Sequence, residues 1–174
     1  MGKLSLYLAM SKDGYISGPN DDLSFLNPYQ IEGEDYGYST FMDQVDSIVV
    51  GRKTYQWVVS QGYPYHDEKN VFVISKDSRT LPNPNHHYYS GELNRLIKEL
   101  KESTSRIVYC DGGAILAKSL LKLGLIDEMI ISVIPTHLGS GVELFVEGEI
   151  PKNFKQVNKQ EFKSGLTQFQ FKKI

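Results

Sequence analysis

Short runs of consecutive apolar residues alternate along this chain with segments whose apolar residues recur at helical spacing. The runs at 48–50 and 71–74 are rich in valine and isoleucine, which is typical of strands buried on both faces of a parallel sheet. Leu93, Leu96 and Leu100 recur every three or four residues, so they predict an amphipathic helix over 91–102. Strands and helices that alternate in this way are typical of an α/β fold.

The complete pattern predicts a mixed sheet. Residues 19–33 contain two prolines, two asparagines and several acids, which predicts a loop with one helical turn. The last twenty residues alternate polar and apolar around Gly165, which predicts an antiparallel hairpin. We expect strands at 4–10, 46–50, 71–75, 86–89, 107–110 and 129–134, and helices at 34–44, 54–60, 91–102 and 113–123.

Length and composition narrow the class of protein. The 174 residues predict one domain spanning 1–174, and a net charge of −2 gives no field typical of nucleic-acid or membrane-surface binding. The single cysteine, Cys110, cannot form an internal disulfide and fits a reducing compartment. Its place on a buried strand favours a small core residue. The sequence contains no span of about 20 apolar residues, the length needed to cross a bilayer, and the N-terminal apolar stretch is too short for a signal peptide. We therefore expect a soluble, cytoplasmic protein.

The first candidate for chemistry is the turn after the predicted strand 46–50. Gly51 is followed by Arg52, Lys53 and Thr54, two cations and a hydroxyl at the carboxyl end of a strand, where ligands sit in open α/β folds. The run lacks the second glycine of a Walker loop, and the chain contains no G-x-G-x-x-G fingerprint. An anion site and an ordinary turn with solvated cations both fit these residues.

Two further strand ends carry groups suited to anions. Gly112 and Gly113 stand between the strand 107–110 and a helix, where backbone N–H groups and the helix dipole favour negative charge. Ser75 and Lys76 end the strand 71–75 with a hydroxyl and a cation. Taken alone, the glycine pair fits an ordinary tight turn equally well, and Ser75 and Lys76 fit an ordinary strand end better than an anion site. Their occurrence at three strand ends predicts one extended ligand with several phosphates, such as a phosphorylated dinucleotide.

Together these stretches resemble the dihydrofolate reductase-like superfamily, and within it the branch similar to the reductase domain of riboflavin biosynthesis. The resemblance implies a three-layer α/β fold with a central mixed, mostly parallel sheet and NADPH lying across the strand ends. It also makes a homodimer the expected assembly. The stretches that carry it occur in family order and cover most of the chain: SKDGYISG (11–18), VVGRKTY (49–55), VFVISK (71–76) and the run from DGGAIL to VELF (111–145).

Site residues follow from this resemblance, position by position. Residues of the first turn would contact the phosphates of NADPH, those at 75 and 76 its 2′-phosphate, and those at 112–115 its pyrophosphate. Two backbone groups seven residues apart would meet the nicotinamide amide. The implied cofactor-binding residues are Ala9, Ile16, Gly51, Arg52, Lys53, Thr54, Ser75, Lys76, Gly112, Gly113, Ala114 and Ile115.

The candidate catalytic residue is Asp35, which lies sixteen residues before Gly51, where folate reductases place the carboxylate that orients and protonates the pterin. The acids Glu32, Glu34 and Asp35 form an acidic patch that suits the solvated start of a helix better than a catalytic site. The Asp13-Gly14 pair predicts a turn, and a catalytic role for Asp13 is the less favoured alternative.

Other residues bear on the substrate. Glu68 falls near the position of the arginine that grips the folate tail, and SFLNPY (24–29) replaces the Pro-Trp loop, so folate is disfavoured. Riboflavin-pathway reductases carry a cation just after Asp-Gly, where this chain has Tyr15, although Lys12 could compensate. The favoured function is an NADPH-dependent reductase of a small, possibly heterocyclic substrate of unknown identity. The alternatives, in order, are the riboflavin-pathway reduction of 5-amino-6-(5-phosphoribosylamino)uracil, dihydrofolate reduction, and nucleotide binding without turnover.

No metal site is expected. His86 and His87 are neighbours on a predicted strand and point to opposite faces, while the other two histidines, His66 and His137, are scattered. Several tyrosines crowd the loops, where they would either line a substrate pocket or cover a sheet edge: Tyr29, Tyr36, Tyr38, Tyr63 and Tyr65.

Overall fold

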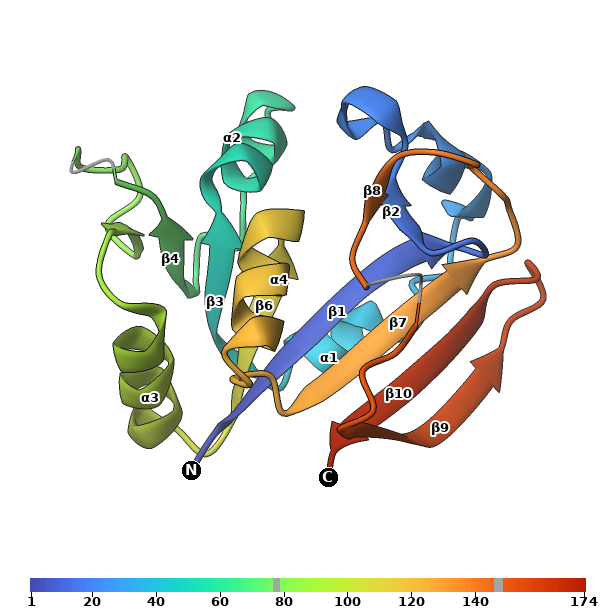
Figure 1. The fold of residues 1–174 in the computed structure, drawn as a ribbon. Coiled ribbons are helices and arrows are strands. Elements are labelled where there is room, and N and C mark those ends of the chain that lie inside the picture. The colour runs from blue at the N-terminus through green and yellow to red at the C-terminus, as the bar shows by residue number, and fades with distance from the viewer. Residues whose placement is uncertain (77–78, 146–148) are drawn as a thin grey trace. The chain divides into compact units, whose positions relative to one another are not determined.

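The computed structural model describes residues 1–76, 79–145 and 149–174, and Figure 1 shows the arrangement of its elements. The chain forms two compact units. Unit 1 comprises residues 1–6 and 44–127, and unit 2 comprises residues 7–43 and 128–174. The strand β1 (Lys3–Ser11) contributes residues to both units. The expectation of a single domain over 1–174 stays a prediction.

Unit 1 is a parallel sheet with three helices. Its strand order is β5-β4-β3-β6-β1, and every pairing among these strands is parallel. The side chains of Ile48, Val49, Val50, Val71 and Val73 are fully buried, which explains the uninterrupted apolar runs in the sequence. Besides β1, the elements of unit 1 are β3 (Val45–Gly51), α2 (Arg52–Ser60), β4 (Asn70–Ile74), β5 (His86–Tyr89), α3 (Leu93–Ser103), β6 (Ile107–Gly112) and α4 (Ala114–Lys122).

Unit 2 is built around antiparallel pairs. Strand β10 pairs with β7 on one side and with β9 on the other, both antiparallel. The β9–β10 hairpin turns at Gly165, whose φ of 88° suits glycine, so the predicted C-terminal hairpin is confirmed. The elements are β2 (Tyr15–Ser17), η1 (Pro19–Asp21), η2 (Ser24–Tyr29), α1 (Tyr38–Met42), β7 (Glu128–Ile134), β8 (Val142–Glu143), β9 (Phe154–Glu161) and β10 (Thr167–Lys173).

The predicted fold class is confirmed. The strands form a large, mixed, mostly parallel sheet, and β2 and β8 form a second, small antiparallel sheet that the hydropathy pattern did not predict. These two strands have only three and two residues, too few for an alternation to be recognised. Cys110 is a buried core residue, and burial raises the pKa of its thiol to about 12.

The predicted helix at 34–44 is wrong in its first part, because only α1 (Tyr38–Met42) is helical. Tyr36 and Gly37 have φ angles of 56° and 81°, in the left-handed region, which a right-handed helix cannot include. The helix predicted at 54–60 begins two residues earlier, at Arg52, directly after the strand. This second difference bears on function, since it places the Arg52 and Lys53 side chains on the first turn of a helix.

We predict a homodimer in solution. Strand β9 stands at the end of the strand order, and most of its side chains are exposed, including Val157. An edge strand presents backbone N–H and C=O groups that a second copy can pair with. Light scattering at micromolar protein should give twice the chain mass of 19.7 kDa, and Val157→Lys should shift the mass towards one chain. A single-chain mass for the wild-type protein across that range would contradict the prediction.

Candidate functional site

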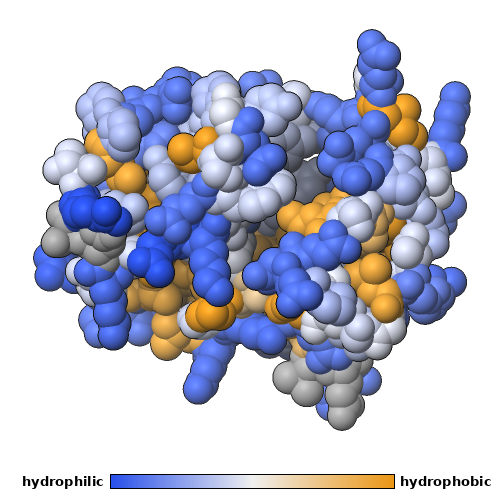
Figure 2. Space-filling model, turned by 90° about the horizontal axis from the view of Figure 1, so that it is seen from above, coloured by the Kyte–Doolittle hydropathy of each residue, from blue (hydrophilic) through white to orange (hydrophobic). Residues whose placement is uncertain are grey.

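Three strand ends of unit 1 lie in register at one edge of its sheet. Gly51 of β3 is paired with Ile74 of β4, and Val50 of β3 is paired with Gly112 of β6. The turns that follow these strands therefore begin at the same level of the sheet. The arrows of β3 and β4 point upward in Figure 1, and Figure 2 shows this side from above, with many hydrophilic side chains and smaller apolar patches between them.

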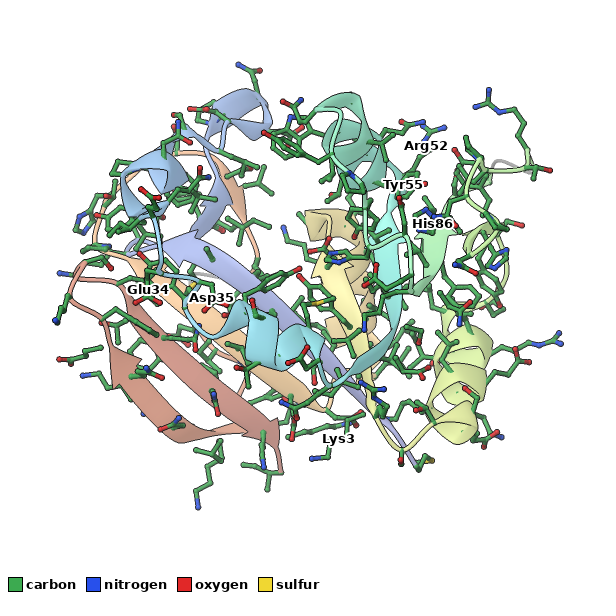
Figure 3. All side chains as sticks on the ribbon, turned by 180° about the vertical axis from the view of Figure 1, so that it is seen from behind. Lys3, Glu34, Asp35, Arg52, Tyr55 and His86 are labelled. Atoms are coloured by element: carbon green, nitrogen blue, oxygen red, sulfur yellow. The ribbon has the colours of Figure 1, made fainter. Side chains whose placement is uncertain are left out.

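The turn from β3 into α2 presents a helix N-terminus. Gly51 is the N-cap residue of α2, with no side-chain cap, and the first turn of the helix contains no acid. The first backbone N–H groups of a helix lack intrahelical partners and attract anions. The side chains of Arg52 and Lys53 are exposed beside them, and Figure 3 shows Arg52 at this end of α2. An anion at this turn would meet N–H donors and two cations.

The turn from β6 into α4 presents a second helix N-terminus next to the first. Gly112 and Gly113 have φ angles of 93° and 81°, and α4 also lacks a side-chain cap. A Cβ at Gly113 would lie 3.3 Å from the Thr54 hydroxyl oxygen and 3.6 Å from the Cα of Gly51, while nothing lies within 4 Å of a Cβ at Gly112. The two turns are thus in close contact, and no atom crowds Gly112 on the side where a Cβ would stand.

The third strand end carries the predicted contacts to a 2′-phosphate. Ser75 follows β4 directly, and its backbone N–H donates to the carbonyl of Tyr89 at 3.0 Å. Lys76 is exposed one residue further along. Unit 1 therefore gathers ten of the predicted cofactor residues at one edge of its sheet: Gly51, Arg52, Lys53, Thr54, Ser75, Lys76, Gly112, Gly113, Ala114 and Ile115.

A half-buried carboxylate beside these strand ends was not predicted from the sequence. The Asp111 carboxylate accepts hydrogen bonds from the hydroxyl of Tyr109, at 2.5 Å, and from that of Tyr65. Burial raises the pKa of Asp111, and the two tyrosine hydrogen bonds oppose that rise. The tyrosines thus occupy both oxygens of the acid that immediately precedes the glycine pair. An acid directly before an anion-suited turn was the available signal for such a cluster.

Unit 2 fixes the loop that contains the predicted nicotinamide contacts. Ala9 lies on β1 beside the apolar cluster around Phe25, and Ile16 is the central residue of β2. The Asp13 carboxylate holds this loop, since it accepts hydrogen bonds from the Ser11 hydroxyl at 2.6 Å and the Gly139 N–H at 2.7 Å. The expectation that Asp13 is a turn residue agrees with this geometry, and the carboxylate also joins two distant loops.

Protonation of Asp13 should loosen this loop. Burial acts to raise its pKa, but hydrogen bonds from Ser11, Gly139 and Leu138 outweigh it and lower the pKa to about 2, from 3.8. The contribution to stability is therefore complete above about pH 3.8 and is lost as the pH falls through about 2. Asp13→Asn should lower the melting temperature at pH 6, and the gap to wild type should shrink towards pH 2. The control is Glu32→Gln in an exposed loop, and an equal gap at both pH values would contradict the prediction.

The predicted catalytic residue, Asp35, is exposed and engaged by backbone groups. Its carboxylate accepts hydrogen bonds from the N–H groups of Gly37, at 2.9 Å, and Ser39, at 3.0 Å, at the start of α1. Hydrogen bonds from Ser39 and Gly37 lower the pKa of Asp35, so the group is ionised at neutral pH. Figure 3 shows Glu34 and Asp35 together on the segment before α1. The catalytic role of Asp35 stays a prediction. An ionised carboxylate can orient the substrate.

A buried polar network next to Asp35 was also missed. The Tyr7 hydroxyl donates to the carbonyl of Tyr36 at 3.0 Å, and the Gln168 side-chain amide donates to the Tyr7 oxygen at 2.9 Å. Burial raises the pKa of Tyr7, the hydrogen bond from Gln168 lowers it, and the charge of Asp35 raises it. Tyr7 therefore stays a neutral phenol. Its position inside an apolar strand run concealed it in the sequence.

Over the part of the chain that the structure describes, no three His, Cys, Asp or Glu side chains gather as a group that could hold a metal ion. His86 is buried, whereas His87 is exposed on the same strand. Within the same described ranges, the helices are all too short or too polar to traverse a bilayer. The tyrosines do not form one cluster, because Tyr63 and Tyr65 belong to unit 1 whereas Tyr29, Tyr36 and Tyr38 belong to unit 2.

Two known proteins are similar to this chain in sequence. The chain is 34% identical over 83% of its length to the uncharacterized protein YwjB of Bacillus subtilis, of which it covers 83%. It is 30% identical over 94% of its length to dihydrofolate reductase type 1 of Escherichia coli, of which it covers 93%.

Solved structures extend the comparison. A putative riboflavin biosynthesis protein from Shewanella sp. PV-4 is 31% identical, with a TM-score of 0.86 and 99% of both chains covered. Dihydrofolate reductase from Enterococcus faecalis shares the fold at 12% identity, with a TM-score of 0.69 over 99% of this chain and 96% of the other. The family model described as the RibD C-terminal domain matches residues 3–168, and the chain therefore belongs to the RibD C-terminal domain family, within the dihydrofolate reductase-like superfamily.

Proposed function

We propose that this protein is an NADPH-dependent reductase that transfers a hydride to a small, heterocyclic substrate. The family is related to reductases, which supports oxidoreductase chemistry in general. The choice of cofactor rests on the carboxyl ends of the parallel strands in unit 1. Two uncapped helix N-termini meet there, and a third strand end adds Lys76. A ligand with several phosphates matches these donors and cations better than a ligand with one charge.

The residues present fit the phosphates of NADPH. No atom crowds Gly112 on the side where a Cβ would stand, and the N–H groups at the start of α4 would hold the pyrophosphate. Arg52, Lys53 and Lys76 would supply positive charge to the remaining phosphates. When bound, the cofactor supplies the hydride, and the protein contributes binding and orientation. The proton that completes the reduction would come from water or an acid near the substrate, and the Ala9 and Ile16 backbone groups would contact the nicotinamide amide.

A second candidate is the reduction of 5-amino-6-(5-phosphoribosylamino)uracil in riboflavin biosynthesis. The similarity to the Shewanella protein over 99% of both chains favours it. The presence of Tyr15, rather than a cation, after Asp13-Gly14 argues against a phosphorylated substrate. Dihydrofolate reduction ranks third, because Glu68 falls near the position of the tail-binding arginine, despite the 30% identity to a dihydrofolate reductase. Nucleotide binding without turnover ranks last.

The direct test measures NADPH oxidation as the loss of NADPH absorbance. The protein is incubated with a panel of carbonyl and imine compounds that includes the uracil ribose-phosphate substrate and dihydrofolate. Turnover of one uncharged heterocycle well above the two named substrates would support the proposal. Tight NADPH binding without turnover of any compound would favour a nucleotide-binding protein instead.

We predict that Asp35→Asn lowers turnover about 10²- to 10⁴-fold, the range attributed to a positioned acid or base. NADPH affinity should not change, because the predicted phosphate contacts all belong to unit 1 and Asp35 to unit 2. The measurement is kcat with a turned-over substrate together with the Kd for NADPH. Glu34→Gln is the matched control, since Glu34 is the neighbouring exposed acid and also accepts a backbone N–H, from Tyr36 at 2.7 Å. Unaltered kcat in Asp35→Asn would exclude Asp35 and move the role to a water, to Asp22 or to no side chain at all.

A further inference from the structure

A pocket of about 520 Å³ lies within unit 1, bounded by α2, the segment that follows it and the segment that leads into β5. Its volume is in the range of small-molecule sites. Its walls are mainly aromatic and aliphatic, with the rings of Tyr55, Tyr63, Tyr65 and Tyr88 among the lining side chains. None of the predicted cofactor residues lines it. The proposed function therefore leaves this pocket without a role.

His86 gives the pocket a hydrogen-bonding group without a partner. Its side chain is only 4% exposed, and its Nδ1 lies 2.8 Å from the Tyr55 hydroxyl oxygen. Figure 3 shows the two side chains side by side, from α2 and β5. Among the described residues, no group makes a hydrogen bond of good geometry to His86 Nε2, although the His66 backbone lies close enough to the ring to raise the pKa of His86. A buried polar atom without a partner is costly, and a ligand in the pocket would supply one.

The imidazole of His86 is neutral at pH 7. Burial lowers its pKa below the ordinary 6.5, although the backbone of His66 and the carboxylate of Asp67 act in the opposite direction. Burial also raises the pKa of Tyr55, which keeps the phenol protonated. The contact between Tyr55 and His86 fits either tautomer, and in the one where the Tyr55 hydroxyl donates to Nδ1 the ring carries its proton on Nε2. The group offered to a ligand is then an N–H donor.

The charge of the pocket selects the ligand further. Of the lining residues, which all lie in the part of the chain that the structure describes, Asp67 is the only acid, and none is a lysine or an arginine. The Asn83 amide already donates to the Asp67 carbonyl at 3.2 Å, and the Ser60 hydroxyl donates to the Trp57 carbonyl at 2.6 Å. A carboxylate in a pocket that tyrosine rings also line favours a cation or an amino group and repels anions.

We propose that this pocket binds a planar, amino-substituted nitrogen heterocycle that keeps a ring nitrogen or a carbonyl oxygen free to accept a hydrogen bond. A ring nitrogen or carbonyl of the ligand accepts the Nε2–H of His86, its amino group donates to Asp67, and its ring packs on the tyrosines. The phosphate edge at Gly51 and Gly112 has the opposite charge preference. The proposal is independent of the reductase function, since it names a second ligand at a different set of side chains.

The test uses 2-aminobenzimidazole as the probe, at a pH above its pKa so that one ring nitrogen can accept a hydrogen bond, and indole-2-carboxylate as a planar anion of similar size. Both are titrated into the full chain, and ¹H–¹⁵N spectra record the backbone amides and the His86 ring nitrogens. The variant is Asp67→Asn, and the matched control is Glu68→Gln, which changes an exposed neighbouring acid that does not line the pocket. NADPH binding is measured on all proteins as a check of folding.

We expect saturable shifts at the His86 Nε2 resonance and at amides of the pocket with 2-aminobenzimidazole, and none with the anion. Asp67→Asn should lower the affinity for the probe about tenfold, an effect that the exposure of Asp67 reduces. Glu68→Gln should bind the probe as tightly as the wild-type protein does. Absence of saturation up to millimolar probe would overturn the proposal. Shifts confined to Gly112–Ile115, or equal binding of the anion, would overturn it as well. The His86 signal of the wild-type protein keeps the test decisive even if Asp67→Asn folds poorly.

Discussion

Gly113→Val should abolish measurable binding of both NADPH and NADH. The φ of Gly113 is 81°, which a β-branched residue adopts only with strain, and its Cβ would lie 3.3 Å from the Thr54 hydroxyl oxygen. The added side chain would push apart the two turns at Gly51 and Gly113 and cover the helix N-terminus that we assign to the pyrophosphate. Both cofactors contain this pyrophosphate, so both should lose at least about a hundredfold in affinity, equivalent to roughly 3 kcal/mol.

A matched variant separates the local effect from general destabilisation. Gly33 also has a φ of 81°, lies in unit 2, and has nothing within 4 Å of an added Cβ. Gly33→Val therefore imposes a similar backbone strain far along the chain from the phosphate contacts. Calorimetric titration of both variants, together with their melting temperatures, gives the comparison. If Gly113→Val binds both cofactors as the wild type does, the pyrophosphate is held elsewhere.

The strands of unit 1 could be predicted because burial on both faces leaves a simple signature. Val71 and Val73 are fully buried, and the run that contains them was found within one residue of β4. The start of α1 could not be predicted, since it depends on the positive φ angles of Tyr36 and Gly37. An acidic stretch rich in tyrosine does not specify these angles. Local sequence therefore determines where apolar layers lie, but less well where a short helix begins.

The predicted site shows the same division. Glycines and cations that directly follow strands could be placed at one sheet edge, because parallel strands bring their carboxyl ends together. The contacts of Asp111 with Tyr65 and Tyr109 could not be found in this way. Tyr65 is 46 residues away from Asp111, on a segment with no periodic pattern, and the pairing arises only from packing within unit 1. The same holds for Tyr55 and His86, which are 31 residues apart.

The preference for NADPH over NADH should be about a hundredfold, and Lys76 should account for much of it. The two cofactors differ by a 2′-phosphate with nearly two negative charges. Hydrogen bonds to charged groups contribute about 1.5–3 kcal/mol each, so two of them suffice for this ratio even after losses to solvent. Lys76 is exposed, as is Arg52, so screening by salt reduces the effect of each.

Lys76→Ala should therefore lower the affinity for NADPH about tenfold and leave the affinity for NADH unchanged, because NADH lacks the group that Lys76 would contact. Raising the salt concentration should narrow the gap between the two cofactors in the wild-type protein and have little effect in the variant. Lys98→Ala is the control, since Lys98 is also exposed in unit 1 but lies on α3, paired with Glu102 at 3.9 Å. The measurement is a pair of dissociation constants for each protein at two salt concentrations. Equal affinities for NADPH and NADH in the wild type, or an equal loss for both in Lys76→Ala, would show that Ser75 and Lys76 do not bind a 2′-phosphate.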